Sequence, residues 1–171
     1  MWSGDLRESL REAGVSADGV DLDPLCPFDI CDVFSQAFLD KYGKQNYDLC
    51  LCLEVAEHLP EERATEFVQR LVRVAPTVLF SAAFPGQGGH GHINCQPKSY
   101  WIAKFNRENY VLDEVATKNV VEFMRSGYHM GWFVSNTMVF RSYGSTCYEQ
   151  IVREETPQAA RLAEYLKAVT F

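Results

Sequence analysis

Two acidic residues and a histidine follow directly on an apolar run in the segment Tyr47–Pro60, which reads YDLCLCLEVAEHLP. A near-continuous apolar run is typical of a strand buried in a parallel sheet. This run is followed by Glu54, Glu57 and His58. Ligands of open α/β sheets bind outside the carboxyl ends of the strands. Carboxylates can accept protons or bind cations, and an imidazole that titrates near neutral pH can act as a base. The segment therefore predicts a functional site.

A glycine-rich loop with two histidines follows the next apolar run, Thr77–Phe84. Residues 84–105 read FPGQGGHGHINCQPKSYWIAKF, and the glycines permit positive φ angles and the close approach of a ligand. The loop carries His90, His92 and Asn94, which are polar groups at the expected edge of the sheet. The alternative is a mobile surface loop in front of a helix whose aromatic residues belong to the core.

Apolar spacing and turn residues predict strands that alternate with helices along the chain. We expect helices over residues 3–13, 35–42, 60–74, 99–107 and 156–169. We expect strands over residues 20–22, 28–33, 47–53, 77–84, 110–114 and 133–141. Such alternation predicts an α/β fold with a doubly wound, mostly parallel sheet, and the last two strands predict an antiparallel closing pair that adds an antiparallel edge strand. One domain over residues 1–150 and a C-terminal helix within residues 151–171 are the expected organisation.

The composition of the 171 residues is that of a globular protein, with 47% hydrophobic residues. A net charge of −7 argues against binding along a nucleic-acid backbone, which requires clustered Lys and Arg. No apolar run approaches the 20 residues of a membrane span, and the start of the chain does not read as a signal peptide. We expect a cytoplasmic protein with no membrane partner, whose six cysteines are buried structural thiols.

The motif over Tyr47–Pro60 resembles the signature after strand 4 of class I S-adenosylmethionine-dependent methyltransferases of the small-molecule type, and so implies a Rossmann-like sheet. In that family Glu54 lines the cofactor and acceptor side. The segment Gly19–Pro24, GVDLDP, resembles the family's second motif. This implies that Asp21 binds the ribose hydroxyls of the cofactor and that Leu22 lies against the adenine. Asp32 resembles the third motif, in which an aspartate accepts from the adenine amino group.

The glycine-rich loop resembles that of a subgroup of small bacterial and viral methyltransferases, in which PGQGG-x-GH-[apolar]-N follows strand 5. There the loop borders the pocket for the methyl acceptor, which implies that His90, His92, Asn94, Tyr100 and Trp101 surround a small-molecule acceptor. The catalytic residues implied are Glu54, His58 and His92, with one of the two histidines as the base. The activity implied is methyl transfer from S-adenosylmethionine, and the chain is predicted to be an enzyme.

A metal-dependent site is the alternative for the same residues. The spacing Glu54-x-x-Glu57-His58 is similar to the E-x-x-E-H string of small-RNA 2′-O-methyltransferases and ubiquinone-pathway O-methyltransferases. There the two carboxylates and the histidine bind a divalent ion, for which His92 or His90 would supply a fourth ligand. The string also occurs in many relatives that bind no metal, and no metal is the expectation here.

One part of the family's pattern is absent from the start of the chain. Class I methyltransferases begin with a strand and a turn of the form E/D-x-G-x-G-x-G, whereas this chain begins Met1-Trp2-Ser3 at the expected first helix. In the family's strand order, 3-2-1-4-5-7-6, the absent strand 1 lies in the middle of the sheet. We therefore expect an N-terminally truncated sheet, impaired methyl transfer and a fragment of a longer protein. The alternative is a non-catalytic methyltransferase-like binding or scaffold subunit, whose sheet a partner chain completes.

Overall fold

The computed structural model of the chain describes residues 6–25, 28–127 and 131–143. Its helices are α1 (Leu6–Glu12), α2 (Gln36–Tyr42), α3 (Ala64–Leu71), α4 (Lys98–Arg107), α5 (Glu114–Gly127) and α6 (Gly131–Asn136). Its strands are β1 (Val20–Asp21), β2 (Asp29–Ile30), β3 (Cys50–Leu53), β4 (Thr77–Ser81), β5 (Tyr110–Leu112) and β6 (Met138–Ser142). The predicted C-terminal helix over residues 156–169 and the boundary after residue 150 lie outside the described residues.

Four of the strands form one sheet in the order β3-β4-β6-β5. β3 and β4 are parallel, with Cys52 opposite Phe80, whereas β6 is antiparallel to both of its neighbours. The fold is thus mixed α/β with a mostly parallel sheet, as predicted. β5 is the edge strand and pairs antiparallel with β6, so the predicted antiparallel closing pair and its edge strand are present, with β6 inside the sheet.

β1 and β2 form a separate, parallel two-stranded sheet. Among the described residues β1 pairs only with β2, and β3 only with β4, so no strand joins the two sheets. The small sheet is anchored to the main body after β2, where Phe34 packs against Phe67 on α3 with the two ring centres 6.1 Å apart. The guanidinium of Arg63 lies 3.7 Å from the centre of the same Phe34 ring.

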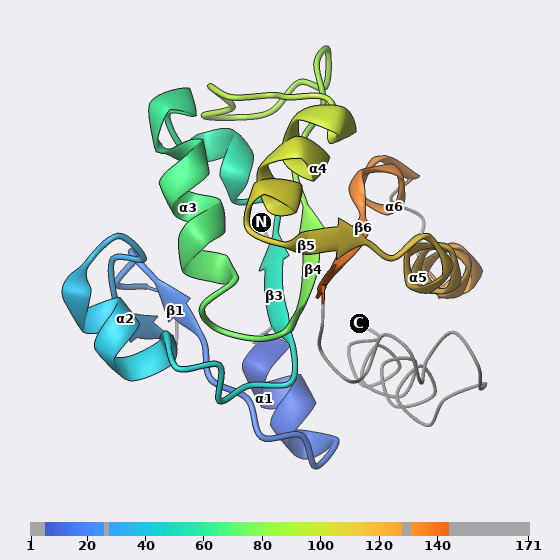
Figure 1. Ribbon diagram of the computed structural model, residues 1–171. Helices are drawn as coiled ribbons and strands as arrows, with labels where there is room; N and C mark the ends of the chain where they lie inside the picture. The colour runs from blue at the N-terminus through green and yellow to red at the C-terminus, as the bar shows by residue number, and fades with distance from the viewer. Residues whose placement is uncertain (1–5, 26–27, 128–130, 144–171) are drawn as a thin grey trace.

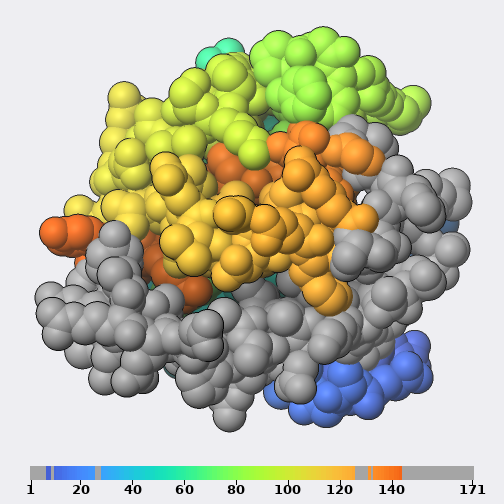
Figure 2. All heavy atoms as spheres, turned by 90° about the vertical axis from the view of Figure 1, so that its right-hand side faces the viewer, coloured from blue at the N-terminus to red at the C-terminus, as the bar shows by residue number. Residues whose placement is uncertain are grey.

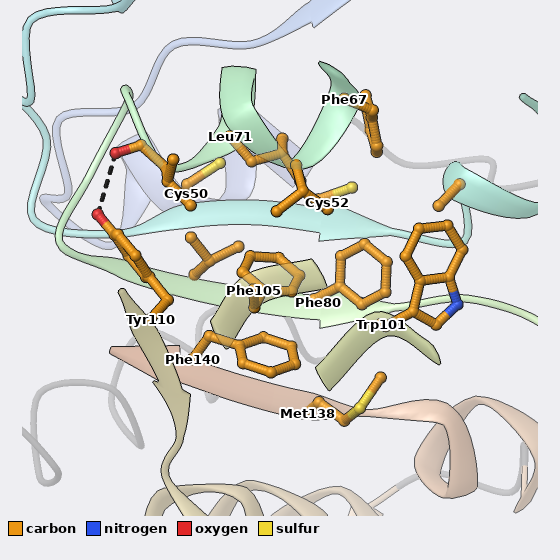
Figure 3. Packing of buried hydrophobic residues seen from close by; sticks show 14 of the residues in the cluster. Cys50, Cys52, Phe67, Leu71, Phe80, Trp101, Phe105, Tyr110, Met138 and Phe140 are labelled. Atoms are coloured by element: carbon orange, nitrogen blue, oxygen red, sulfur yellow. Dashed lines mark hydrogen bonds between the residues drawn. The ribbon is translucent and has the colours of Figure 1, made fainter. Parts of the chain in front are cut away.

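Helices cover both faces of the four-stranded sheet, with α3 and α4 on one side and α5 and α6 on the other (Figure 1). The layer under α3 and α4 contains stacked and edge-to-face aromatic rings (Figure 3). Phe105 and Phe140 stack with ring centres 3.8 Å apart, and Phe80 lies edge-on to Phe105. Cys50 and Cys52 point into this layer, and burial raises the pKa of the Cys50 thiol to about 12. The prediction of buried structural thiols is confirmed for these two residues, while Cys31 and Cys95 are partly exposed.

Two elements on the second face differ from the prediction. The helix α5 was not predicted, although Asp113 caps it: the Asp113 carboxylate accepts a hydrogen bond from the Ala116 amide. The range 133–141 was predicted as one strand, but its first half belongs to α6. The neighbouring residues Phe133 and Val134 are both buried in one cluster with α5 residues, whereas consecutive residues of a strand point to opposite faces of the sheet.

The predicted helix over residues 60–74 also divides in two. A 3₁₀ turn, Glu61–Arg63, precedes α3, and another such turn, Ala56–His58, follows β3. None of the helices in the described ranges has the length and apolar character that crossing a lipid bilayer requires.

Candidate functional site

Glu54, the residue directly after β3, adopts an unusual backbone conformation. Its φ angle is 55°, in the left-handed region that residues other than glycine seldom occupy. Hydrogen bonds from its amide to the carbonyl and hydroxyl oxygens of Ser81 hold the backbone in place. Burial, and then the neighbouring carboxyl group of Glu57, raise the pKa of the Glu54 carboxyl. Backbone strain at a polar residue on a strand end is typical of functional sites.

The Glu54 side chain is held by Asn136, which sequence reasoning did not find. The Asn136 amide donates to both carboxylate oxygens of Glu54, at 3.2 and 3.3 Å, and to the side-chain oxygen of Gln87 at 3.0 Å. Asn136 is 1% exposed. It thus joins the end of β3, the loop after β4 and the end of α6, and Figure 2 shows this loop in light green beside α6 in orange. No sequence signal marked Asn136, because it lies inside the range predicted as a strand.

Glu57 is fully buried, and among the described residues neither of its carboxylate oxygens has a hydrogen-bond partner. Its backbone carbonyl accepts from the amides of Ile93 and Asn94, both at 2.9 Å. These two bonds tie the turn after β3 to the glycine-rich loop. A buried carboxylate without partners is costly, because the charge loses its hydration and gains nothing in return. Such a group indicates a site for a positively charged ligand.

Two histidines face the Glu57 carboxylate. The Nε2 atom of His92 lies 4.0 Å from Glu57 Oε1, and the rings of His58 and His92 are edge-on with centres 5.0 Å apart. One ligand atom from each of the three residues lies within 4.8 Å of the other two. Carboxylate oxygen and imidazole nitrogen are donors that divalent cations accept, and the unpartnered Glu57 carboxylate would be neutralised by one. The residues present therefore fit a metal ion, and they are Glu57, His58 and His92 without Glu54.

The other residues predicted to surround an acceptor are divided between the loop and the core. His90 is exposed and does not belong to the Glu57 group. Asn94 is buried beside the cluster, and its backbone N–H donates to the backbone carbonyl of Glu57. Tyr100 is half-buried, with the ammonium of Lys104 over its ring. Trp101 is 1% exposed and packs against Phe80, so in this structure it is a core residue (Figure 3).

The residues predicted to bind the cofactor lie at the ends of the two short strands: Asp21 is the last residue of β1, Leu22 follows it, and Asp32 comes two residues after β2. The Asp21 carboxylate accepts from the Asp23 amide, and the Asp32 carboxylate accepts from the Phe34 amide, both at 2.9 Å. Each carboxylate thus stabilises its own turn, and both residues are exposed. Leu22 is 64% exposed. Their role as a cofactor site stays a prediction.

No family model matches this sequence, and neither the curated proteins nor the solved structures compared with it give a match.

Proposed function

We propose that the chain carries out methyl transfer from S-adenosylmethionine to a small-molecule acceptor. The observation that carries the proposal is the order of the strands, β2-β1 in one sheet and β3-β4-β6-β5 in the other, with only β6 reversed. This is the order 3-2 and 4-5-7-6 that the resemblance implies once strand 1 is left out. The αβα layers around the larger sheet also support a Rossmann-like arrangement.

Each short strand is followed by a carboxylate and by exposed apolar surface. In the proposed function Asp21 accepts from the ribose hydroxyls and Asp32 from the adenine amino group. Leu22 and Ile30, which are 64% and 65% exposed, supply apolar surface for the adenine ring. When bound, the sulfonium supplies an electrophilic methyl group, whose bond to sulfur breaks as its bond to the acceptor atom forms. In the proposed function, the proton that leaves the acceptor is taken up by Glu54, His58 or His92.

The proposal is tested by calorimetric titration of S-adenosylhomocysteine into the chain. We expect one S-adenosylhomocysteine to bind per chain. Asp21→Asn keeps the shape and the bond from the Asp23 amide but removes a charged acceptor, so we expect affinity to fall by about tenfold or more. Asp23→Asn is the matched control, since the Asp23 carboxylate accepts a similar hydrogen bond from the backbone amide of Leu25. Binding that both variants weaken equally, or a folded chain that binds nothing, would contradict the proposal.

A non-catalytic binding or scaffold role is the second candidate, and the edge of β3 favours it, because within the described ranges β3 pairs only with β4. The amides of Cys52 and Glu54 point toward β4, so those of Leu51 and Leu53 point the other way. An added strand from a partner would pair with such an edge. Hydrogen exchange measures this directly: in the isolated chain the Leu51 and Leu53 amides should exchange much faster than Cys52. Slow exchange at all three positions would remove this candidate.

A further inference from the structure

The cluster of Glu57, His58 and His92 has the composition of a transition-metal site. We infer that these three residues bind a divalent ion of the zinc type, and that Glu54 is not one of its ligands. The inference concerns metal binding by the chain alone. With the ion bound, the lone pairs of His58 and His92 are taken up, and Glu54 is left as the base of the proposed function. The inferred site also differs from the two-carboxylate set that the resemblance implies.

A cation would neutralise the carboxylate at this site. Glu57 is fully buried, and within the described ranges neither of its carboxylate oxygens has a hydrogen-bond partner. Within the described ranges, no ion pair joins it to a Lys or Arg, and its nearest basic group is the His92 ring at 4.0 Å. A cation bound between the carboxylate and the two rings supplies the missing partner.

The two imidazoles are held so that each can offer a nitrogen lone pair. His58 Nδ1 lies 3.1 Å from the carbonyl oxygen of Gly91, so this nitrogen carries the proton and Nε2 carries the lone pair. His92 Nδ1 contacts the thiol of Cys95 at 3.8 Å, which leaves its Nε2 facing Glu57 Oε1. Metal-binding histidines ordinarily hold their second nitrogen in this way.

The spacing of the donor atoms suits closure around an ion. They lie within 4.8 Å of one another, and in a tetrahedral shell with bonds of about 2.0–2.2 Å they would be about 3.4 Å apart. His58 is exposed and His92 is 15% exposed, so both rings can make this movement. While the rings move, the hydrogen bonds from the backbone amides of Ile93 and Asn94 to the Glu57 carbonyl hold the loop in place. Three protein ligands leave one position for water or a further ligand.

The donor set decides which ion fits. Two imidazoles with one carboxylate favour zinc and similar transition metals, whereas Mg²⁺ prefers oxygen ligands and octahedral geometry. Glu54 would add a second carboxylate, but both of its oxygens accept from Asn136. It also lies outside the group of mutually close donor atoms.

Gly89 keeps His92 in this position. A Cβ atom at Gly89 would lie 2.1–2.5 Å from three atoms of the His92 ring, which is closer than any real contact. Any side chain at position 89 therefore displaces the ring. Gly88, the preceding residue, has open space around its Cβ position and serves as a control.

The test uses the full chain stripped of metal with a chelator. Co²⁺ is titrated and followed by its visible absorption, which reports imidazole ligands and coordination number; Zn²⁺ and Mg²⁺ are titrated by calorimetry. We expect one Co²⁺ or Zn²⁺ per chain and no measurable Mg²⁺ binding at equal concentrations. Glu57→Gln and His92→Ala should weaken binding by about 100-fold or more, whereas His90→Ala and Glu54→Gln should stay within about threefold.

Each result decides the assignment. A loss with Glu54→Gln as large as that with Glu57→Gln would replace the three-ligand site by a two-carboxylate site. Absence of Co²⁺ binding by a folded chain, shown by circular dichroism, would overturn the inference. Gly89→Ala retains every ligand, so it tests the geometry even where Glu57→Gln or His92→Ala fails to fold. It should weaken Co²⁺ binding by about 10-fold and change the absorption bands, while Gly88→Ala should do neither. Equal effects of the two glycine variants would also overturn the inference.

Discussion

The ends of β3 and β4 and the ends of β1 and β2 carry the same types of residue but are built in different ways. After β1 and β2, the carboxylates of Asp21 and Asp32 are exposed and accept bonds from amides two residues further on. After β3, Glu54 and Glu57 are half or fully buried, and their surroundings come from distant parts of the chain. A carboxylate that stabilises its own turn needs nothing else, whereas a buried one depends on the whole fold. The second arrangement, a buried carboxylate surrounded by distant parts of the chain, is the one expected of a ligand-binding site.

The largest expected difference between the two regions is in packing. Trp101→Ala removes a buried ring that packs on Phe80 and should lower the free energy of unfolding by about 3–5 kcal/mol. Leu22→Ala, at the end of β1, should change it by less than about 0.5 kcal/mol, because Leu22 is 64% exposed. Urea denaturation measures both values. A small effect of Trp101→Ala would mean that the ring is not part of the core.

The next effect is a gain in stability. Glu57→Met replaces a buried carboxylate without partners by an apolar side chain of similar length, so without metal the free energy of unfolding should rise by about 1–3 kcal/mol. Asp32→Asn, at an exposed turn, is the control and should have little effect. Thermal melts in the presence of a chelator measure the change. A destabilised Glu57→Met variant would show that the carboxylate has a partner in solution.

Asn136→Ala tests whether the β3 region depends on contacts from distant elements. It removes the donor to Glu54 and Gln87, and we expect a loss of about 1–3 kcal/mol in the free energy of unfolding. The loop over residues 85–91 should also exchange its amide hydrogens faster. Ser135→Ala removes an exposed hydroxyl that bonds only within α6, and it should leave the loop unchanged.

The smallest effect concerns pH. Because burial raises the pKa of Glu54 in the folded state, the folded protein binds this proton more tightly than the unfolded chain does. The contribution of Glu54 to stability is therefore full below the ordinary glutamate pKa and is lost as pH rises through the raised folded value. Glu54→Gln should flatten this part of the stability curve. A curve that keeps its slope in the variant would assign the slope to another group.

The local patterns of the chain sufficed for many of its elements. The strand Cys50–Leu53 and the helices Gln36–Tyr42 and Lys98–Arg107 lie within a few residues of the predicted ranges. The signals for them depend on neighbours within one or two turns. The segment of α5 carries such signals too, since Asp113 is a cap and Val120 and Met124 are one turn apart.

What the sequence by itself determined is the α/β alternation and the placing of acidic and histidine residues after apolar strands. Only the tertiary structure decided which of them meet: Glu57 with His58 and His92, and Glu54 with Asn136 instead. Asn136 is 82 residues from Glu54, and no local pattern encodes a contact over that distance. The burial of Glu57 likewise arises from the packed layers and the loop together, because a side chain loses its water only when separate segments close around it.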